Sequence, residues 1–328
     1  MDKNFIVFET NRLDKFLSLH IDASRNQIEQ LIKKGFVKVD NKQTTKTGLK
    51  LKQNQKIDVS FPEVELNKRK DEDFIKESLK DKEVKVIYED EHILVVNKPY
   101  NLTVHDAPSV KDATLVDWLK LKNISLSTIS GEERHGIVHR LDKGTSGVMV
   151  VAKTNEAHIN LSKQLEDKTM GRYYLAIIDL PLKENIIIEK PIARNPNNRL
   201  KMAIVENGKF AKSAFNKIAL SKNEKYELIA AKLFTGRTHQ IRVHISSINR
   251  HIIGDNLYGF KGELNKINRF YLHAYSLYLN HPITNKQMNF KADIPNDMNN
   301  FFTQYFNTEN FDEQLDENNI ISSFSTFN

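Results

Sequence analysis

Short β-branched and aromatic segments, separated by turn residues, constrain the fold of this chain most. Between residues 86 and 234, the segments that predict strands outnumber those that predict helices. The clearest are Val86–Tyr88, Ile93–Val96, Val148–Ala152, Tyr173–Ile178 and Tyr226–Phe234. A further pair, residues 201–205 and 209–218, flanks Asn207-Gly208, a dipeptide typical of a hairpin turn. We therefore expect an α+β domain with a mixed, largely antiparallel sheet and flanking helices.

A small module precedes this region. We expect one helix to start at Arg12 and a second to follow Ser24, whose hydroxyl can cap the first turn. Gly35 ends the second helix, and Asp40-Asn41 makes a turn after a short strand in which apolar residues alternate with lysines. Residues 1–61 are thus interpreted as a small α/β domain.

Charge divides the rest of the chain. Residues 62–85 are charged and hold few apolar side chains, so we expect a linker with some helical content, because so little apolar surface cannot offset chain entropy. Residues 86–304 form the large domain. Residues 305–328 carry five acidic residues and no Lys or Arg, a composition that predicts a flexible tail.

Composition excludes several classes of protein. The chain has no cysteine, which rules out disulfides, thiolate metal sites and cysteine nucleophiles. No apolar run approaches the roughly 18–20 residues of a membrane span, and the first residues do not form a signal peptide, so we expect a cytoplasmic protein. The net charge is +7, and residues 1–60 carry twelve Lys or Arg against seven Asp or Glu. This excess fits a polyanionic partner and equally a solvated basic surface.

The segment GIVHRLDKGTSG, residues 136–147, concentrates charge in front of an expected strand. Asp142 has two cationic neighbours within two residues, and nearby cations keep a carboxylate ionised and nucleophilic. The alternative is structural: the Asp142 side chain can cap the following turn through an Asx hydrogen bond. The segment alone favours the structural role.

The segment TGRTHQIRVH, residues 235–244, follows another expected strand. Thr238 can cap a helix whose apolar face includes Ile241 and Ile245. Arg237 then lies at a helix N-terminus, where free N–H groups favour an anion, either a phosphate or the carboxylate of Asp142. An exposed arginine at a helix start is the plain alternative.

Together, these two segments resemble the RluA-type pseudouridine synthases. The resemblance runs over residues 86–290 in the family's order and spacing and includes Asn97-Lys98-Pro99, Gly254-Asp255, Tyr258-Gly259 and Leu272-His273-Ala274. The N-terminal module is similar to an S4 RNA-binding domain in Arg12–Leu17, Ser24-Arg25 and Lys34-Gly35-Phe36-Val37. The combination resembles the RluC and RluD branches, and RluD more closely.

The resemblance implies an enzyme that isomerises specific uridines to pseudouridine in large-subunit ribosomal RNA, free or in an assembling large ribosomal subunit. The uracil is reused within the site, so no cofactor is implied. Asp142 is then the catalytic carboxylate, Tyr174 stacks on the uracil, Arg237 pairs with the aspartate, and Arg140 helps to displace the target base.

The resemblance also implies supporting residues. His139 and His239 are expected to be hydrogen-bonding residues behind the site or in the core. Leu272 is expected to form the apolar floor of the pocket, and Lys98 either to contact RNA or solvent or to serve the structure. The RNA contacts expected in the S4-like module are Arg12, Arg25, Lys33, Lys34 and Lys38. Two residues depart from the family's pattern: Gly144 stands where Asp is usual, and Arg172 where Lys is usual.

Other functions stay open as alternatives. One is a uridine target in tRNA, and another is a non-catalytic RNA-binding or ribosome-assembly protein, against which the set of Asp142, Tyr174 and Arg237 argues. A metal-dependent RNA hydrolase would need clustered ligands. His135 and His139 would lie about 13 Å apart on a strand, and two further histidines, five residues apart, about 140° apart on a helix. No metal site is therefore expected.

Overall fold

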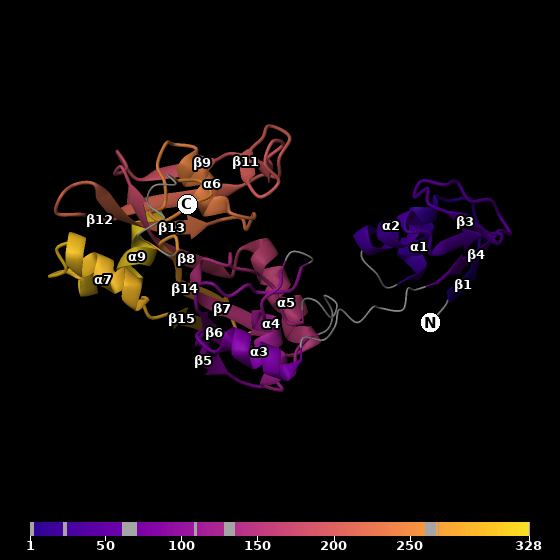
Figure 1. Cartoon of the computed structure of the whole chain (residues 1–328), viewed down its shortest axis with the longest axis horizontal. Helices are drawn as coiled ribbons and strands as arrows, with labels where there is room; N and C mark the ends of the chain where they lie inside the picture. The colour runs from indigo at the N-terminus through magenta and orange to yellow at the C-terminus, as the bar shows by residue number, and fades with distance from the viewer. Residues whose placement is uncertain are drawn as a thin grey trace. The chain divides into compact units, whose positions relative to one another are not determined.

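The computed structural model describes residues 3–21, 25–60, 71–107, 110–127, 135–259, 267 and 269–327 (Figure 1). The chain divides into two compact units, residues 1–71 and 72–328, and each is described by itself. Within the described ranges, no helix combines the length and the apolar character needed to cross a membrane.

The first unit is a four-stranded antiparallel sheet with two helices. Its elements are β1 (Lys3–Ile6), α1 (Leu13–His20), α2 (Arg25–Lys33), β2 (Val37–Val39), β3 (Lys42–Thr44) and β4 (Lys56–Val59), and the strand order is β1-β4-β2-β3. The apolar faces of both helices pack with the strands in one core. Asp40 and Asn41 have positive φ angles of 48° and 64° in the two-residue turn between β2 and β3, which confirms the predicted turn. The predicted cap, Ser24, lies outside the described residues.

The second unit contains a large sheet and flanking helices. Its strands are β5 (Lys85–Glu89), β6 (Ile93–Lys98), β7 (Ser146–Ala152), β8 (Gly171–Asp179), β9 (Ile186–Glu189), β10 (Ile192–Arg194), β11 (Met202–Ile204), β12 (Lys212–Leu220), β13 (Tyr226–Leu233), β14 (Leu272–Asn280) and β15 (Gln287–Lys291). Its helices are α3 (Glu72–Leu79), α4 (Leu115–Leu121), α5 (Asn155–Asp167), α6 (Gln240–Ser246), α7 (Asn296–Tyr305), α8 (Phe311–Gln314), α9 (Glu317–Ser323) and the 3₁₀ turn η3 (Ser325–Phe327).

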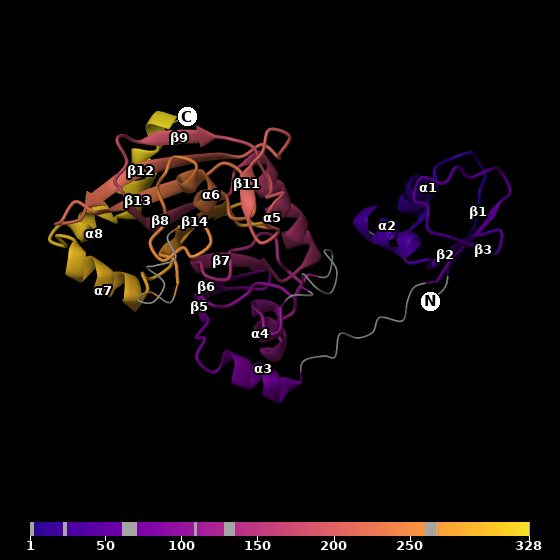
Figure 2. The same cartoon turned by 45° about the horizontal axis from the view of Figure 1, so that its top comes forward.

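The large sheet has the order β5-β6-β7-β14-β8-β13-β12-β9, with β15 beside β14. Strands β7 and β14 pair in parallel, and every other pairing recorded among the described strands is antiparallel. The α+β class with a largely antiparallel sheet is therefore confirmed. Figure 2 shows α3 and α4 beside β5 and β6, and α7 and α8 beside β12 and β13.

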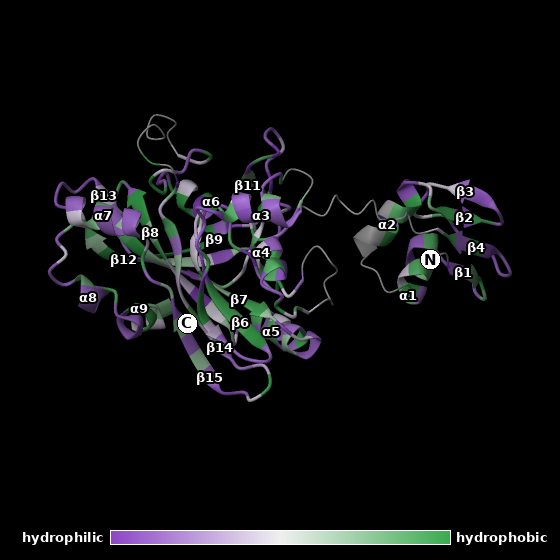
Figure 3. Cartoon of the chain, turned by 60° about the horizontal axis from the view of Figure 1, so that its bottom comes forward, coloured by the Kyte–Doolittle hydropathy of each residue, from purple (hydrophilic) through white to green (hydrophobic). Residues whose placement is uncertain are grey.

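Strand β8 separates two apolar faces. Its alternate residues Tyr173, Leu175 and Ile177 pack against the C-terminal helices, whereas Tyr174, Ala176 and Ile178 belong to the core cluster on the other face, together with Ile241 of α6. Strands buried on both faces read as continuous hydrophobic runs. In Figure 3, the green of β6 and β7 marks such runs of hydrophobic residues.

The predicted hairpin around Asn207-Gly208 is wrong. The turn exists, because Gly208 N donates to Val205 O at 2.8 Å. However, β11 pairs with β10 in a separate two-stranded sheet, whereas β12 pairs with β9 and β13 in the large sheet. The turn dipeptide predicts the local reversal of the chain but not the partners of the strands that follow it.

Two further expectations need correction. The prediction of a flexible tail is wrong, because residues 311–323 form α8 and α9, and Phe306, Phe311 and Phe324 are buried. The predicted linker, residues 62–85, extends too far, because α3 lies within that range and buries Ile75 and Leu79 in the core of the second unit. In both segments, a few well-spaced apolar side chains outweigh the many charged ones.

Candidate active site

A pocket of about 700 Å³ opens on the face of the sheet that carries Tyr174. Three stretches of chain build most of it: the loop before β7, the first residues of β8, and the segment from the end of β13 into α6. Its wall contains six Lys or Arg side chains and a single carboxylate, Asp142. The charged lining residues are Arg140, Asp142, Lys168, Arg172, Lys232, Arg237 and Arg242. The pocket therefore suits an anionic ligand.

Asp142 lies in the turn that leads into β7. Its backbone carbonyl accepts a hydrogen bond from Thr145 N at 3.0 Å, and this closes the turn. The side chain is 16% exposed, and its Oδ2 accepts from Arg242 Nη1 at 3.0 Å. The Asx hydrogen bond considered above is absent from the contacts of Asp142 in the described part of the chain, and Oδ1 has no partner there. Asp142 thus offers one held oxygen and one open oxygen.

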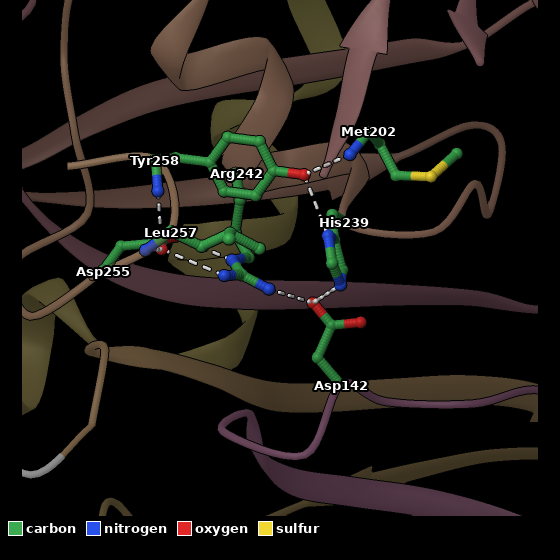
Figure 4. Close-up of polar contacts among 7 residues, drawn as sticks. All are labelled: Asp142, Met202, His239, Arg242, Asp255, Leu257 and Tyr258. Carbon is green, nitrogen blue, oxygen red and sulfur yellow. Dashed lines mark hydrogen bonds and ion pairs between the residues drawn. The ribbon is translucent and has the colours of Figure 1, made fainter. Parts of the chain in front are cut away.

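Arg242 links Asp142 to a second carboxylate (Figure 4). Its Nε and Nη2 donate to Asp255 at 2.7 and 2.9 Å, while Nη1 reaches Asp142. Asp255 is fixed in turn by the backbone N–H groups of Leu257 and Tyr258. Burial alone would lower the pKa of Arg242, but the hydrogen bonds and charges of Asp255 and Asp142 raise it. The guanidinium is a permanent cation in a fixed position.

Aromatic rings confine the same guanidinium. Its carbon lies 4.2 Å from the centre of the Phe270 ring and 4.9 Å from that of Tyr258. A Cβ atom at Gly144 would come within 2.6 Å of the Phe270 ring. Gly144, the departure from the family pattern noted above, therefore leaves the space in which Phe270 stacks on Arg242.

The predicted ion pair between Arg237 and Asp142 is wrong. Arg237 is exposed at the edge of the pocket, and its Nε donates to Phe210 O at 2.9 Å. Helix α6 begins only at Gln240, after an N-cap residue in the left-handed conformation whose side chain makes no capping bond. Thr238, the predicted cap, is thus outside the helix. Arg237 therefore does not lie at the helix start.

Sequence reasoning missed the role of Arg242. A signal was present, because Arg242 directly follows Ile241 and lies within the apolar side of a short helix. A charge on that side must be paired when the helix is buried. Here α6 buries both residues. What the sequence did not reveal was the partner, because Asp142 lies 100 residues earlier.

Tyr174 and Leu272 line the pocket beside Asp142 as expected. Both are at most 4% exposed. The register pairs Tyr174 with Ala274 and Leu272 with Ala176, so the two side chains share one face of the sheet. Burial raises the pKa of Tyr174, which keeps its phenol neutral. An aromatic ring and an aliphatic side chain thus stand together next to the carboxylate.

The residues expected to support the site, His139, Arg140 and Lys98, differ in burial and in their contacts. His139 is buried and its Nε2 accepts from Val150 N at 3.2 Å; burial and the charge of Arg172 lower its pKa well below the usual range. Arg140 is exposed at the pocket and faces His105 at 3.5 Å. Lys98 is fully buried and donates to two backbone carbonyls, so the considered contact with RNA or solvent is wrong and the structural role holds. Burial, more than nearby charges, lowers the pKa of Lys98 to about 7.

His239 makes a second contact to Asp142 and has the supporting, hydrogen-bonding place expected of it. His239 Nε2 lies 3.9 Å from Asp142 Oδ2, and its Nδ1 lies 2.9 Å from the hydroxyl of Tyr258 (Figure 4). That hydroxyl also accepts from Met202 N at 2.7 Å. Burial lowers the pKa of His239 despite the charge of Asp142. Burial thus favours the neutral form of the ring beside the carboxylate.

The basic residues of the first unit are mostly exposed. Lys33, Lys34 and Lys38 all face solvent. Arg12 is half exposed and donates twice to the buried Asp14, at 3.0 and 2.8 Å. The side chain of Arg25 lies outside the described residues. No group of three His, Asp or Glu that could hold a metal occurs in the part of the chain that the structure describes.

Comparison with known proteins identifies the family of the chain. The model of the RNA pseudouridylate synthase family matches residues 92–247, and that of the S4 domain matches residues 11–57. A protein of Helicobacter pylori, described as an uncharacterized RNA pseudouridine synthase, is 47% identical over 99% of both chains. The chain belongs to the RNA pseudouridine synthase family. It is therefore an isomerase that acts on RNA and carries an S4 RNA-binding domain.

Two further relatives bear on substrate and fold. The ribosomal large subunit pseudouridine synthase D of Zymomonas mobilis is 41% identical over 67% of this chain and 72% of its own. The solved structure of human RNA pseudouridylate synthase domain containing 1 covers 65% of this chain and 84% of its own, with a TM-score of 0.54 and 24% identity. The second likeness supports the fold of the synthase domain alone.

Proposed function

We propose that this synthase isomerises uridines of large-subunit ribosomal RNA and that Asp142 is its catalytic carboxylate. The single observation that carries the assignment is the state of Asp142. Among the described residues of the pocket wall it is the only carboxylate, one oxygen is held by Arg242, and the other has no partner in that part of the chain. A carboxylate fixed in this way can act on a substrate without first being oriented.

The reaction needs few groups. The bond between N1 of uracil and C1′ of ribose breaks, the base turns, and C5 bonds to C1′, while the proton lost from C5 is balanced by one gained at N1. The open oxygen of Asp142 can add to the ribose or base, or accept a ribose proton. Each of these steps requires an ionised carboxylate in a fixed position, and Arg242 holds one oxygen of Asp142 in place.

The target base must leave the RNA stack before it can reach Asp142. Unstacking costs a few kcal/mol, and stacking on an aromatic side chain offsets part of this cost. Tyr174 and Leu272 line the pocket beside Asp142 and give the uracil an aromatic and an aliphatic surface. Arg140, exposed at the pocket, is positioned to occupy the space that the base leaves.

The choice of large-subunit RNA rests on two features. The S4 domain is an RNA-binding module, and the Zymomonas mobilis relative is named for the large ribosomal subunit. A ribosomal RNA substrate also fits the expected location in the cytoplasm.

Pseudouridine mapping tests the substrate. Cells with and without this chain are compared across all ribosomal and transfer RNAs, and we expect pseudouridine to be lost at discrete positions of large-subunit RNA. Loss confined to transfer RNA would overturn the choice of substrate.

Asp142→Asn tests the catalytic assignment. The variant keeps the size and most hydrogen bonds of the side chain but removes the charge, so we expect no pseudouridine formation in a tritium-release or mass-spectrometric assay. RNA binding should remain, since the positive pocket wall is unchanged. Turnover that survives in Asp142→Asn would exclude Asp142 as the catalytic group.

A further inference from the structure

Arg172 differs from the other buried arginines of this chain. Among the described residues, three arginines are at least nine-tenths buried: Arg172 at 8%, Arg242 at 5% and Arg269 at 4% exposure. Arg242 is bonded to Asp255 and Asp142, and Arg269 to Asp297 and Ser146. Arg172 forms no ion pair among the described residues, and its Nε has no hydrogen-bond partner there.

A buried cation without a partner is costly. Buried charges are normally paired, because desolvation is not otherwise compensated. The surroundings of Arg172 supply no compensating acid. His139, Tyr174, Tyr278 and Lys232 are near it, and the only carboxylate of the pocket wall, Asp142, is already held by Arg242. An anion that enters the pocket would compensate the charge of Arg172.

The position of Arg172 indicates which part of a nucleotide it meets. Arg172 and Tyr174 are two residues apart on β8, so they face the same side at a spacing of about 6.6–6.8 Å. A nucleotide separates its base from its phosphate by one ribose. A uracil at Tyr174 and Leu272 can therefore place a phosphate at Arg172.

The guanidinium of Arg172 faces a glycine on the segment between β13 and α6. A Cβ atom at Gly236 would lie 3.6 Å from Arg172 Nη2, so the guanidinium reaches the segment between β13 and α6. Gly236 brings no side chain to fill that space. Lys168, Lys232 and Arg237 complete a cationic rim on the same pocket. A guanidinium can hold two phosphate oxygens at once.

We propose that Arg172 binds a backbone phosphate of the RNA next to the everted uridine. This inference rests on the proposed function, because it places the uracil beside Asp142. Arg172 then anchors the ribose–phosphate backbone while the base turns. Hydrogen bonding of Arg172 to a uracil carbonyl is the competing possibility, and the two differ in their response to the charge of the phosphate.

A test that combines a protein substitution with an RNA modification separates phosphate binding from hydrogen bonding to the uracil. The probe is an RNA stem-loop that carries a mapped target uridine, with single methylphosphonates that remove the charge of one flanking phosphate at a time. We expect Arg172→Gln to weaken binding of the natural stem-loop about 10- to 100-fold, as one methylphosphonate does with the unaltered protein. The two changes together should weaken binding no further than either alone. Arg172→Lys should retain part of the affinity.

The control is Lys163→Gln on the exposed side of α5, which removes the same charge outside the pocket wall. We expect it to bind like the unaltered protein. Undiminished affinity in Arg172→Gln, or losses that multiply with every methylphosphonate, would overturn the phosphate assignment. Pseudouridine formation by the unaltered protein on the same RNA is measured alongside. If it is absent, the proposed function fails, whereas if it is present, the binding result bears on the role of Arg172 alone.

Discussion

Arg242 and Arg237 lie five residues apart and end in opposite environments. Arg242 is buried between two carboxylates and two aromatic rings, whereas Arg237 is exposed and bonded to a backbone carbonyl. Both are cations of the same pocket wall. Only Arg242 can hold the carboxylate of Asp142 in place, so substitutions at the two positions should have different consequences.

We predict that Arg242→Lys lowers kcat about 100-fold. A single ammonium group cannot bind both oxygens of Asp255 and reach Asp142, so the carboxylate is displaced, and displacements of about 1 Å can have effects of this size. Arg237→Gln should weaken RNA binding and raise KM while kcat is retained. Steady-state kinetics on one stem-loop separates the two. Equal losses of kcat at both positions would contradict the assigned geometry.

The sequence predicted the residues of the site better than their partners. Asp142, Tyr174 and Leu272 come together as the resemblance implied. The ion pair was assigned to the wrong arginine because an arginine near a helix start is a recognisable local pattern. An ion pair between residues 100 positions apart leaves no such local pattern in the sequence. His239 was expected to be a hydrogen-bonding residue behind the site or in the core, but its partner Tyr258 could not be named from the sequence.

Elements were predictable where the pattern is local. The β-branched runs correspond to β6, β7, β8 and β13, and Asp40-Asn41 forms its predicted turn. Pairing was not predictable, because β7 lies parallel to β14 through contacts such as Ser146 with His273, 127 residues apart. The helices after Phe306 were missed because the acidic residues dominate the composition. The pattern that indicates these helices is the spacing of the apolar residues.

We predict that Phe324→Ala lowers the free energy of unfolding by about 3–5 kcal/mol. Phe324 is 1% exposed, and its ring centre lies 5.4 Å from that of Tyr173 on β8. The same segment is also tied by polar contacts, including Tyr275 Oη to Leu315 O at 2.6 Å. Denaturant unfolding of the whole chain measures the change.

The matched control for the tail is Asn318→Ala. Asn318 lies on α9 and is exposed, so the change should stay within about 0.5 kcal/mol. If the tail were frayed, as its composition alone suggested, neither substitution would alter stability. A loss in Phe324→Ala with none in Asn318→Ala therefore distinguishes a packed tail from a flexible one.

At the scale of the whole molecule, each of the two units carries basic residues of its own. The S4 domain presents Lys33, Lys34 and Lys38 to solvent, and the synthase unit carries the cationic pocket. Arg12 is different, because its guanidinium is bonded to Asp14 and stabilises the start of α1. The exposed lysines are thus the residues whose removal tests RNA binding without disturbing the core.

We predict that replacing Lys33, Lys34 and Lys38 together by Gln weakens binding to structured RNA and flattens its salt dependence. Each neutralised phosphate releases condensed counterions, so the slope of log K against log salt should fall by about one for every phosphate that the variant no longer neutralises. The chemistry should persist at saturating RNA, because Asp142 and its partners belong to the other unit. The matched control replaces Lys76, Lys80 and Lys120, which are exposed on the synthase unit. An equal decrease in slope for both triple variants would mean that net charge alone attracts the RNA, and the S4 domain would then have no specific part in holding it.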